Sequence, residues 1–231
     1  MPVDPYVYPG TEVLRNVWNI RDAKDLARRE AKVTAVAAAK VARKPIPGRY
    51  DVKHLRAFHR KIFGDVYPWA GKVRTVQITK GGALFAMPQH VEQYLTDTLT
   101  KLKDENYLRG LDRETFVDRC ADYYADLNAA HPFREGNGRT QRAFIGQLAE
   151  EAGYHIRWND LSAARNNTAS RAAHGGDNRP VRRLLAGITG SRTPAVEREQ
   201  TLDPAAEGRE RDQQHYERGT RARDRRPGRS R

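Results

Sequence analysis

The feature of this chain that most limits its fold is a twelve-residue segment at positions 131–142, His-Pro-Phe-Arg-Glu-Gly-Asn-Gly-Arg-Thr-Gln-Arg. It lies between two stretches whose apolar residues recur with helical spacing. Glycine-rich turns and helix N-termini present backbone N–H groups to anions, and arginines suit phosphate oxygens. The carboxylate of the segment can hold a divalent cation, and its histidine can accept a proton near neutral pH. The segment therefore predicts a nucleotide-phosphate site between two helices, with a proton acceptor beside it.

Periodic apolar residues on both sides of this segment predict a mainly α fold. Asp22, Asp51 and Asp112 stand at N-cap positions, where a carboxylate accepts from the first free N–H groups of a helix. Helices are expected over residues 22–42, 51–62, 88–102, 112–130, 137–148, 161–173 and 180–188. The first of these is expected to pack on the core from outside, through a loose stripe of Leu26, Val33, Val36 and Val41.

A glycine pair separates two stretches that favour extended structure. Residues 73–79 alternate between the two sides of an extended chain, and residues 83–86 follow Gly81-Gly82. Two short strands around a glycine pair predict a β-hairpin.

The end of the chain differs in composition from the rest. Residues 191–231 contain few large apolar side chains and many charged ones, so they cannot bury enough surface to offset the entropy of ordering. We expect a disordered tail there. The predicted organisation is thus an N-terminal arm and helix at 1–50, a main domain at 51–190 and the tail at 191–231.

The net charge of +13 leaves a second class of partner open, because basic proteins often bind nucleic acid or other polyanions. No zinc-finger spacing, RNP-type motif or clear helix-turn-helix accompanies the charge, so a non-enzymatic nucleic-acid-binding protein is the weaker hypothesis. No apolar run approaches the ~20 residues that cross a bilayer, and the N-terminus lacks the pattern of a secretion signal. We therefore expect a cytoplasmic protein without a membrane partner.

Residues 131–142 resemble the signature of the Fic family, His-Pro-Phe-x-Asp/Glu-Gly-Asn-Gly-Arg-x-x-Arg, at every fixed position. Residues 78–82 (Ile-Thr-Lys-Gly-Gly) with Phe85 and Ala86 are similar to the β-hairpin "flap" of that family. The order of the expected helices also fits, and the resemblance covers roughly residues 51–188. It implies a Fic-type helical bundle with a short β-hairpin flap.

This resemblance also implies a reaction and a set of site residues. Fic proteins with an intact signature transfer AMP from ATP to a Ser, Thr or Tyr hydroxyl of another protein, with Mg²⁺. The resemblance makes His131 the general base and Glu135 the metal ligand. The expected nucleotide-binding residues are Phe133, Arg134, Gly136, Asn137, Gly138, Arg139 and Arg142 of the signature, with Lys80 and Gly81 of the flap. Phe133 is expected to anchor the loop from below, and Asn167 and Ser170 lie where family members approach adenine.

The expected partners follow from the same resemblance. A target protein would dock as an extended segment on the flap, at Ile78, Thr79 and Lys80. Many Fic proteins carry an inhibitory Ser/Thr-x-x-x-Glu-Gly/Asn helix, and no segment of this chain matches it convincingly. The chain therefore resembles toxins that are restrained by a separate small antitoxin protein.

One alternative within the family is the transfer of another phosphate-linked group. In the Doc branch a lysine replaces the second glycine of the signature and the γ-phosphate is transferred. Gly138 disfavours that branch, whereas the signature leaves other nucleotides and phosphocholine open.

Overall fold

The computed structural model describes residues 4–80 and 83–192, and within these ranges the chain is mainly helical. The helices are α1 (Ala23–Arg43), α2 (Val52–Phe63), α3 (Val91–Asp104), α4 (Arg113–Ala130), α5 (Asn137–Ala152), α6 (Ala163–His174) and α7 (Arg179–Ile188). Each coincides with an expected helix to within a few residues, so the mainly α prediction is confirmed. Pro88–His90, which was expected to begin the third helix, forms a separate 3-10 turn.

The three aspartates at the expected N-cap positions perform that role. Asp22 accepts from the N–H of Asp25 at 2.8 Å, and Asp51 accepts from His54 at 2.8 Å. Asp112 accepts from two backbone N–H groups, at 2.9 and 3.0 Å. Such caps typically contribute about 1 kcal/mol each, which is why α1, α2 and α4 begin where they do.

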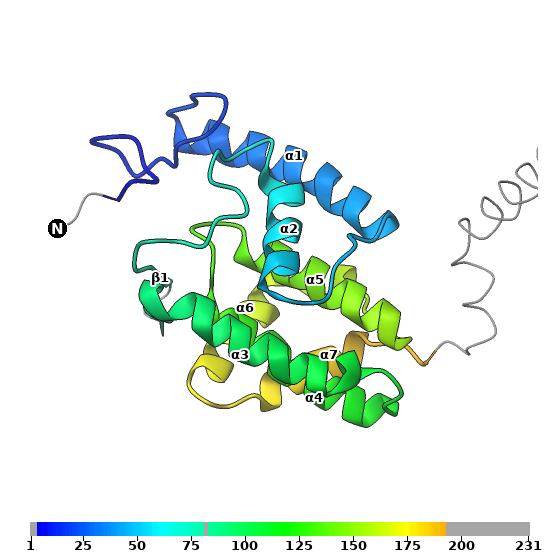
Figure 1. Cartoon of the computed structure of the whole chain (residues 1–231). Coiled ribbons are helices and arrows are strands. Elements are labelled where there is room, and N and C mark those ends of the chain that lie inside the picture. Colours follow the sequence, from blue (N-terminus) through cyan, green and yellow to red (C-terminus); the bar gives the residue numbers. More distant parts are fainter. Residues whose placement is uncertain (1–3, 81–82, 193–231) are drawn as a thin grey trace, which may run out of the picture. The chain divides into compact units, whose positions relative to one another are not determined.

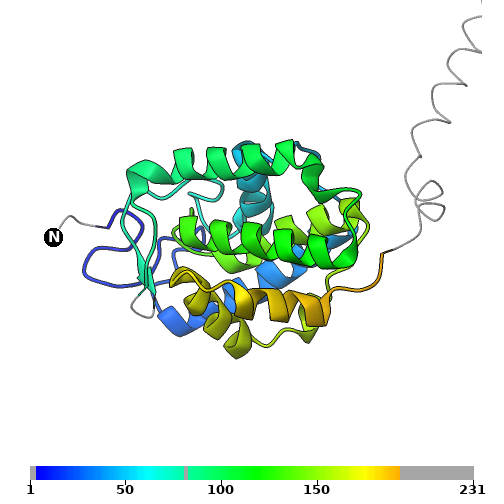
Figure 2. The same ribbon diagram turned by 90° about the horizontal axis from the view of Figure 1, so that it is seen from below.

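α4 and α5 form the centre of the helical unit (Figures 1 and 2). α4 packs against α3, α5, α6 and α7, whereas α5 also packs against α1 and α2. Half of the eighteen residues of α4 are buried, including Phe116, Cys120 and Leu127. The loop 131–136 joins these two central helices, so both of its ends are anchored in the core.

The buried face of α1 agrees with the expected one at Leu26 and Val41 and differs from it at Val36. Leu26, Glu30, Thr34 and Val41 are buried, whereas Val36 is 58 % exposed. Residues four apart share a face of a helix with 3.6 residues per turn, and positions 26, 30 and 34 follow that spacing. The expected stripe of valines was therefore wrong at Val36, and a carboxylate and a hydroxyl take part in the contact with the core instead.

The extended segment is also shorter than expected. β1 (Thr79–Lys80) pairs antiparallel with β2 (Ala83–Leu84), with Thr79 opposite Leu84. Residues 73–78 were expected to be part of the first strand, and the structure assigns them no strand. The residues of the expected turn, Gly81-Gly82, lie outside the described ranges.

Arg74 explains why the alternating pattern at 73–79 does not form a longer strand. Its backbone N–H donates to Pro132 O at 2.8 Å, and its side chain is only 2 % exposed. Its guanidinium donates to the carbonyls of His131 and Val76, each at 2.8 Å, and to that of Ala86. A buried guanidinium must have hydrogen-bond acceptors for its N–H groups. Because Arg74 finds acceptors at the end of α4, the segment around it is held there and does not pair with another strand.

The expected C-terminal tail and the expected lack of a membrane-spanning helix are the two remaining predictions about the fold. Residues 193–231, which include nearly all of the expected tail, lie outside the described residues. Among residues 4–80 and 83–192, no helix is both long and apolar enough to cross a membrane.

Candidate active site

A cavity of about 630 Å³ opens where the loop 131–136 meets the N-terminus of α5. Volumes of this order are usual for small-molecule sites. The described residues that line it come from the strand region, α4, the signature and α6: Ile78, Thr79, Phe85, Tyr124, Asn128, His131, Arg134, Glu135, Gly136, Asn137, Gly138, Arg139, Gln141, Arg142, Asn166, Asn167, Ser170, Arg171 and His174. The structure thus brings together most of the residues expected from the sequence, and it adds a wall from α6.

His131 stands at the C-terminal end of α4 in a left-handed conformation, with φ +43°. Its Nδ1 lies 3.2 Å from the carbonyl oxygen of Asn128, which can only accept, so Nδ1 carries the proton in the neutral ring. That tautomer makes Nε2 the basic nitrogen. The ring of Phe85 stacks on the imidazole at 3.8 Å with an interplanar angle of 16°, which fixes its orientation.

Asn137 determines the shape of the loop that follows. Its Oδ1 accepts from Phe133 N at 2.8 Å, and its Nδ2 donates to Phe133 O at 2.6 Å. The buried side chain therefore holds the backbone of the loop, and the N–H of Asn137 lies at the start of α5. Gly136 has φ +83°, and a Cβ there would lie 2.3 Å from the ring of Phe63, so only glycine fits.

A buried histidine of α2, His59, holds the backbone of the loop through a hydrogen bond. His59 is fully buried; its Nδ1 accepts from Gly71 N at 2.7 Å, and its Nε2 donates to Glu135 O at 3.0 Å. The ring of Phe133 stacks on it at 3.9 Å. Phe133 is 1 % exposed and is not among the described residues that line the cavity; its expected contact with the nucleotide stays a prediction, and its packing agrees with the expected role as an anchor.

The three arginines of the signature have different environments. Arg134 forms an ion pair with Asp4 of the N-terminal arm at 2.9 Å. Arg139 forms an ion pair with Glu30 of α1. Within residues 4–80 and 83–192, Arg142 forms no ion pair with a carboxylate. All three side chains line the cavity together with Arg171, so its charge favours an anion.

Glu135 is the one carboxylate among the described residues that line the cavity. Its side chain is 45 % exposed, its Oε1 accepts from Gly136 N at 2.8 Å, and Arg139 lies 3.7 Å away. The described residues contain no group of three or more potential metal ligands. A hard divalent cation commonly binds to one or two carboxylates together with substrate phosphates, so Glu135 fits such an ion beside a nucleotide.

The sequence predicted the strand side of the cavity only in part. Ile78 and Thr79 line it, Lys80 is paired in β1, and Gly81 lies outside the described residues. Asn167 and Ser170 line the cavity from α6, and their expected approach to adenine stays a prediction. Three further lining residues were not expected from the sequence: Tyr124, whose hydroxyl donates to Asn166 at 3.1 Å, Arg171 and His174. No local pattern marks these residues, because α4 and α6 meet only in the folded chain.

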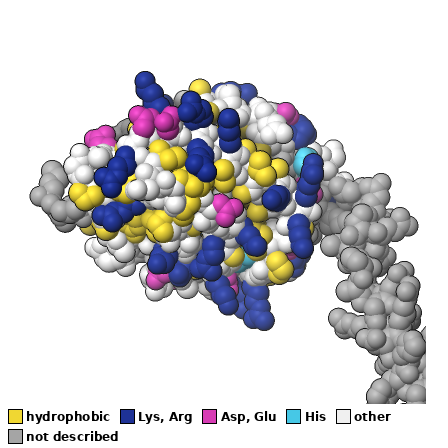
Figure 3. Space-filling view, turned by 90° about the horizontal axis from the view of Figure 1, so that it is seen from above, with side chains coloured by type: hydrophobic (Ala, Val, Ile, Leu, Met, Phe, Trp, Pro, Cys, Tyr) yellow, Lys and Arg dark blue, Asp and Glu magenta, His cyan; other side chains and the backbone are white. Residues whose placement is uncertain are grey.

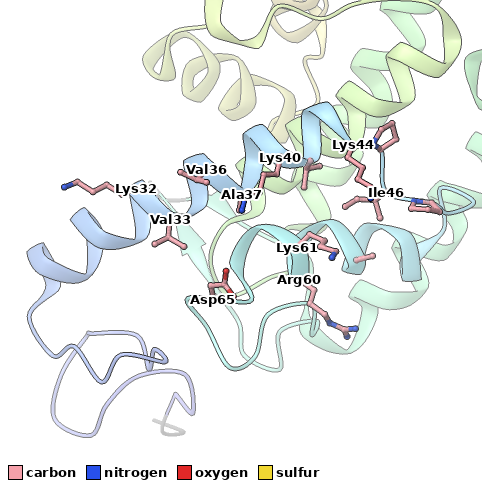
Figure 4. Close-up of a pocket in the computed structure, with 14 residues that line it drawn as sticks. Lys32, Val33, Val36, Ala37, Lys40, Lys44, Ile46, Arg60, Lys61 and Asp65 are labelled. Carbon is pink, nitrogen blue, oxygen red and sulfur yellow. The ribbon is translucent and has the colours of Figure 1, made fainter. Parts of the chain in front are cut away.

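A second, larger hollow of about 1030 Å³ lies between α1 and α2 (Figure 4). Its lining includes Val33, Val36 and Ala37 together with several lysines and Arg60. The face seen in Figure 3 has hydrophobic side chains with lysine and arginine around them. Among the described residues that line this hollow, Asp65 is the one carboxylate and there is no histidine, whereas the cavity beside α5 combines His131, Glu135 and several arginines.

Comparison with known proteins assigns this site to a family. A model of the Fic/DOC family matches residues 49–149. The chain is 43 % identical over 174 residues to the protein adenylyltransferase VbhT of Bartonella schoenbuchensis; the match covers 75 % of this chain and 36 % of VbhT, so the chain spans about a third of that relative. It is 37 % identical over 174 residues to the probable protein adenylyltransferase Fic of Escherichia coli, with coverage of 75 % and 86 %.

A solved structure gives the same result for the fold. The BepC effector protein of Bartonella tribocorum, crystallised with bound AMPPNP, matches with a TM-score of 0.75 and 28 % identity, over 81 % of this chain and 97 % of that one. The chain therefore belongs to the Fic/DOC family. By this homology it is a nucleotidyltransferase of the protein adenylyltransferase class.

His59 makes the stability of this site dependent on pH. Burial, with a smaller effect of nearby Arg139, lowers the pKa of His59 to about 4, below its ordinary value of 6.5. The unfolded chain therefore takes up a proton between pH 6.5 and 4 that the folded chain does not, so this contribution to stability is complete above pH 6.5 and is lost as the pH falls. We expect a loss of about 2 kcal/mol between pH 7.5 and pH 5 from this residue.

Urea unfolding at pH 7.5, 6.5 and 5.0 measures this dependence. In His59→Gln, whose amide can donate and accept without titrating, the loss on acidification should be smaller by about that amount. The exposed His155→Gln serves as the matched control and should behave like the wild type. If His59→Gln loses as much stability as the wild type, the assignment of the pH effect to His59 is wrong.

Proposed function

We propose that this chain is a cytoplasmic protein adenylyltransferase that transfers AMP from ATP to a Ser, Thr or Tyr hydroxyl of a target protein. One observation carries the proposal: an oriented histidine, the first turn of α5 and several arginines line a single cavity. The N–H groups at a helix N-terminus and the arginines suit the phosphates of a nucleotide, and the histidine suits a proton transfer beside them.

In the proposed reaction, the hydroxyl oxygen of the target attacks the α-phosphorus of ATP. A phosphorus–oxygen bond forms, the bond to the β-phosphate breaks, and pyrophosphate leaves. Nε2 of His131 takes the hydroxyl proton, and the contact of Nδ1 with Asn128 O supports this assignment of the two nitrogens. A general base of this kind typically contributes ~10²–10⁴ in rate.

The charge of the triphosphate needs donors that are already in place. Backbone N–H groups around Gly136, Asn137 and Gly138 are proposed to bind the phosphates, because the side chain of Asn137 is committed to the loop. Arg139 and Arg142, three residues apart on α5, are proposed to reach the β- and γ-phosphates. The adenine is proposed to lie along α6, near Asn167 and Ser170.

Glu135 is proposed to hold Mg²⁺ together with phosphate oxygens. The ion, when bound, would neutralise charge on the α- and β-phosphates. The exposure of the carboxylate and its position in the loop support this assignment.

Two protein partners are proposed. A target segment would align along the strand region at Ile78, Thr79 and Lys80 by adding an extended strand. A separate antitoxin would insert a glutamate that pairs with Arg142, because no carboxylate in the described part of the chain already does so. The second partner accounts for the lack of an internal inhibitory motif.

The decisive experiment uses ATP labelled at the α- or the γ-phosphate, incubated with the full chain and a bacterial lysate. We expect label from α-³²P-ATP on protein and none from γ-³²P-ATP, since AMP transfer releases pyrophosphate. His131→Ala should lower the labelling by ~10²–10⁴ while nucleotide binding persists. Transfer of the γ label would indicate phosphate transfer, and full activity of His131→Ala would reject the proposed base.

Removal of metal should abolish the transfer. Glu135→Gln should reduce the rate and raise the Mg²⁺ concentration needed for half-maximal activity, because it removes the one carboxylate among the described residues that line the cavity. Glu150→Gln, at an exposed position of α5, is the matched control. Unchanged turnover in excess EDTA would contradict a role for the metal.

Induction of the chain alone should slow the growth of a bacterial host, since Arg142 has no carboxylate partner in the described chain. His131→Ala should relieve the toxicity, and His155→Ala should retain it. Co-expression of a helix bearing Ser/Thr-x-x-x-Glu should silence the wild type by occupying Arg142. A wild type that becomes active only after deletion of one of its own segments would show that the restraint is internal.

A further inference from the structure

α1 carries a carboxylate on its buried face, where charged residues are rare. Glu30 is 9 % exposed in a helix that the family match at 49–149 does not include. It lies four residues after Leu26 and four before Thr34, on the face that packs against α2 and α5. A buried charge in this position requires partners.

The partners of Glu30 lead directly to the signature. Its Oε1 accepts from Nη2 of Arg139, and its Oε2 accepts from the hydroxyl of Tyr67. Thr34, one turn further along α1, accepts from Nη1 of Arg139 at 2.7 Å. Both terminal nitrogens of the guanidinium are therefore bound to α1. The hydroxyl of Tyr67 donates to the other oxygen of the carboxylate, and burial together with the neighbouring Glu30 raises the pKa of Tyr67 above its ordinary range.

A third contact limits the remaining freedom of Arg139. Its guanidinium lies over the ring of Phe63 in α2, at 4.7 Å from the ring centroid. The side chain nevertheless remains 29 % exposed and lines the cavity. Arg139 is thus held by α1 and α2 and is still accessible to a ligand.

We propose that Glu30 is a positioning residue of the active site, which holds the guanidinium of Arg139 at the cavity wall in the orientation that binds a nucleotide phosphate. This inference rests on the proposed function, since it takes the ligand to be ATP. An arginine that is already fixed loses little rotamer entropy when it binds phosphate, whereas a mobile one loses more. The N-terminal helix would then be part of the nucleotide site.

The geometry favours positioning over simple competition for the arginine. Each terminal nitrogen of a guanidinium carries two N–H groups, and the contacts with Glu30 and Thr34 use one on each nitrogen. The second N–H of each nitrogen is not used by these two contacts and could donate to phosphate with the ion pair intact; the one further carboxylate that the structure gives near them is Glu135, whose Oε1 lies 3.7 Å from Nη2. Arg142 and Arg171 keep positive charge in the cavity although Glu30 neutralises part of that of Arg139.

The test is the dissociation constant of AMPPNP with Mg²⁺ for the full chain, measured by calorimetry. Glu30→Gln should weaken binding about tenfold, and Glu30→Asp, which keeps the carboxylate, should recover part of the loss. Asp25→Asn is the matched control, because Asp25 is an exposed carboxylate of the same helix that pairs with Arg28. In an Arg139→Met background, Glu30→Gln should cause no further loss, since Glu30 acts through Arg139.

Thermal unfolding of each variant checks that it is folded at the temperature of the measurement. If Glu30→Gln does not fold, Thr34→Val supplies a second test, because it removes one contact of Arg139 and retains the ion pair; it should weaken binding severalfold. Unchanged affinity in folded variants, or an equal loss in the Arg139→Met background, would overturn the inference. Tighter binding by Glu30→Gln would also overturn it, and would make Glu30 a competitor of the phosphate. A wild-type chain that binds no nucleotide would reject the proposed function itself.

Discussion

The candidate site depends on the hydrogen bonds between the buried guanidinium of Arg74 and backbone carbonyl groups. The guanidinium donates to the carbonyls of Val76, Ala86 and His131, and thereby joins the strand region to the C-terminal end of α4. A charge buried this deeply is tolerated only when its donors are satisfied, so these three segments are held together. The stacking of Phe85 on His131 agrees with this arrangement, since the neighbouring Ala86 accepts from Arg74 and donates its own N–H to Ala129 O of α4 at 3.1 Å.

The loop between α4 and α5 owes its shape to a small number of polar side chains in an otherwise apolar core. Asn137 binds both backbone groups of Phe133, and His59 binds the carbonyl of Glu135. Buried polar groups of this kind specify one conformation because every alternative would leave a donor or acceptor unsatisfied. The backbone N–H groups at the start of α5 are therefore oriented before any ligand arrives, as electrostatic preorganisation requires.

The arginines of the signature differ in whether they form an ion pair with a carboxylate from outside the signature. Asp4 pairs with Arg134 and Glu30 pairs with Arg139, and both carboxylates come from the region before the family match at 49–149. Arg142 is left without an ion pair in the described chain, and it is the residue for which an external glutamate is proposed. The N-terminal region thus contributes to the electrostatics of a site whose signature lies more than a hundred residues later in the sequence.

The sequence by itself determined the helices that the structure describes, the aspartate caps of α1, α2 and α4, and the signature, because each depends on residues that are close in the chain. Helical periodicity, capping and a twelve-residue motif are local properties, and they place His131, Glu135 and Arg142 on one loop and helix. Only the tertiary structure decided which residues surround that motif. The alternating pattern at 73–79 predicted a longer strand, but the hydrogen bonds of Arg74 to distant residues hold this segment in another conformation. The burial of Glu30 was not predicted, because the valines of the same helix indicated a different buried face. Such contacts join residues that are 57 and 109 positions apart, and no local pattern encodes a partner at that distance.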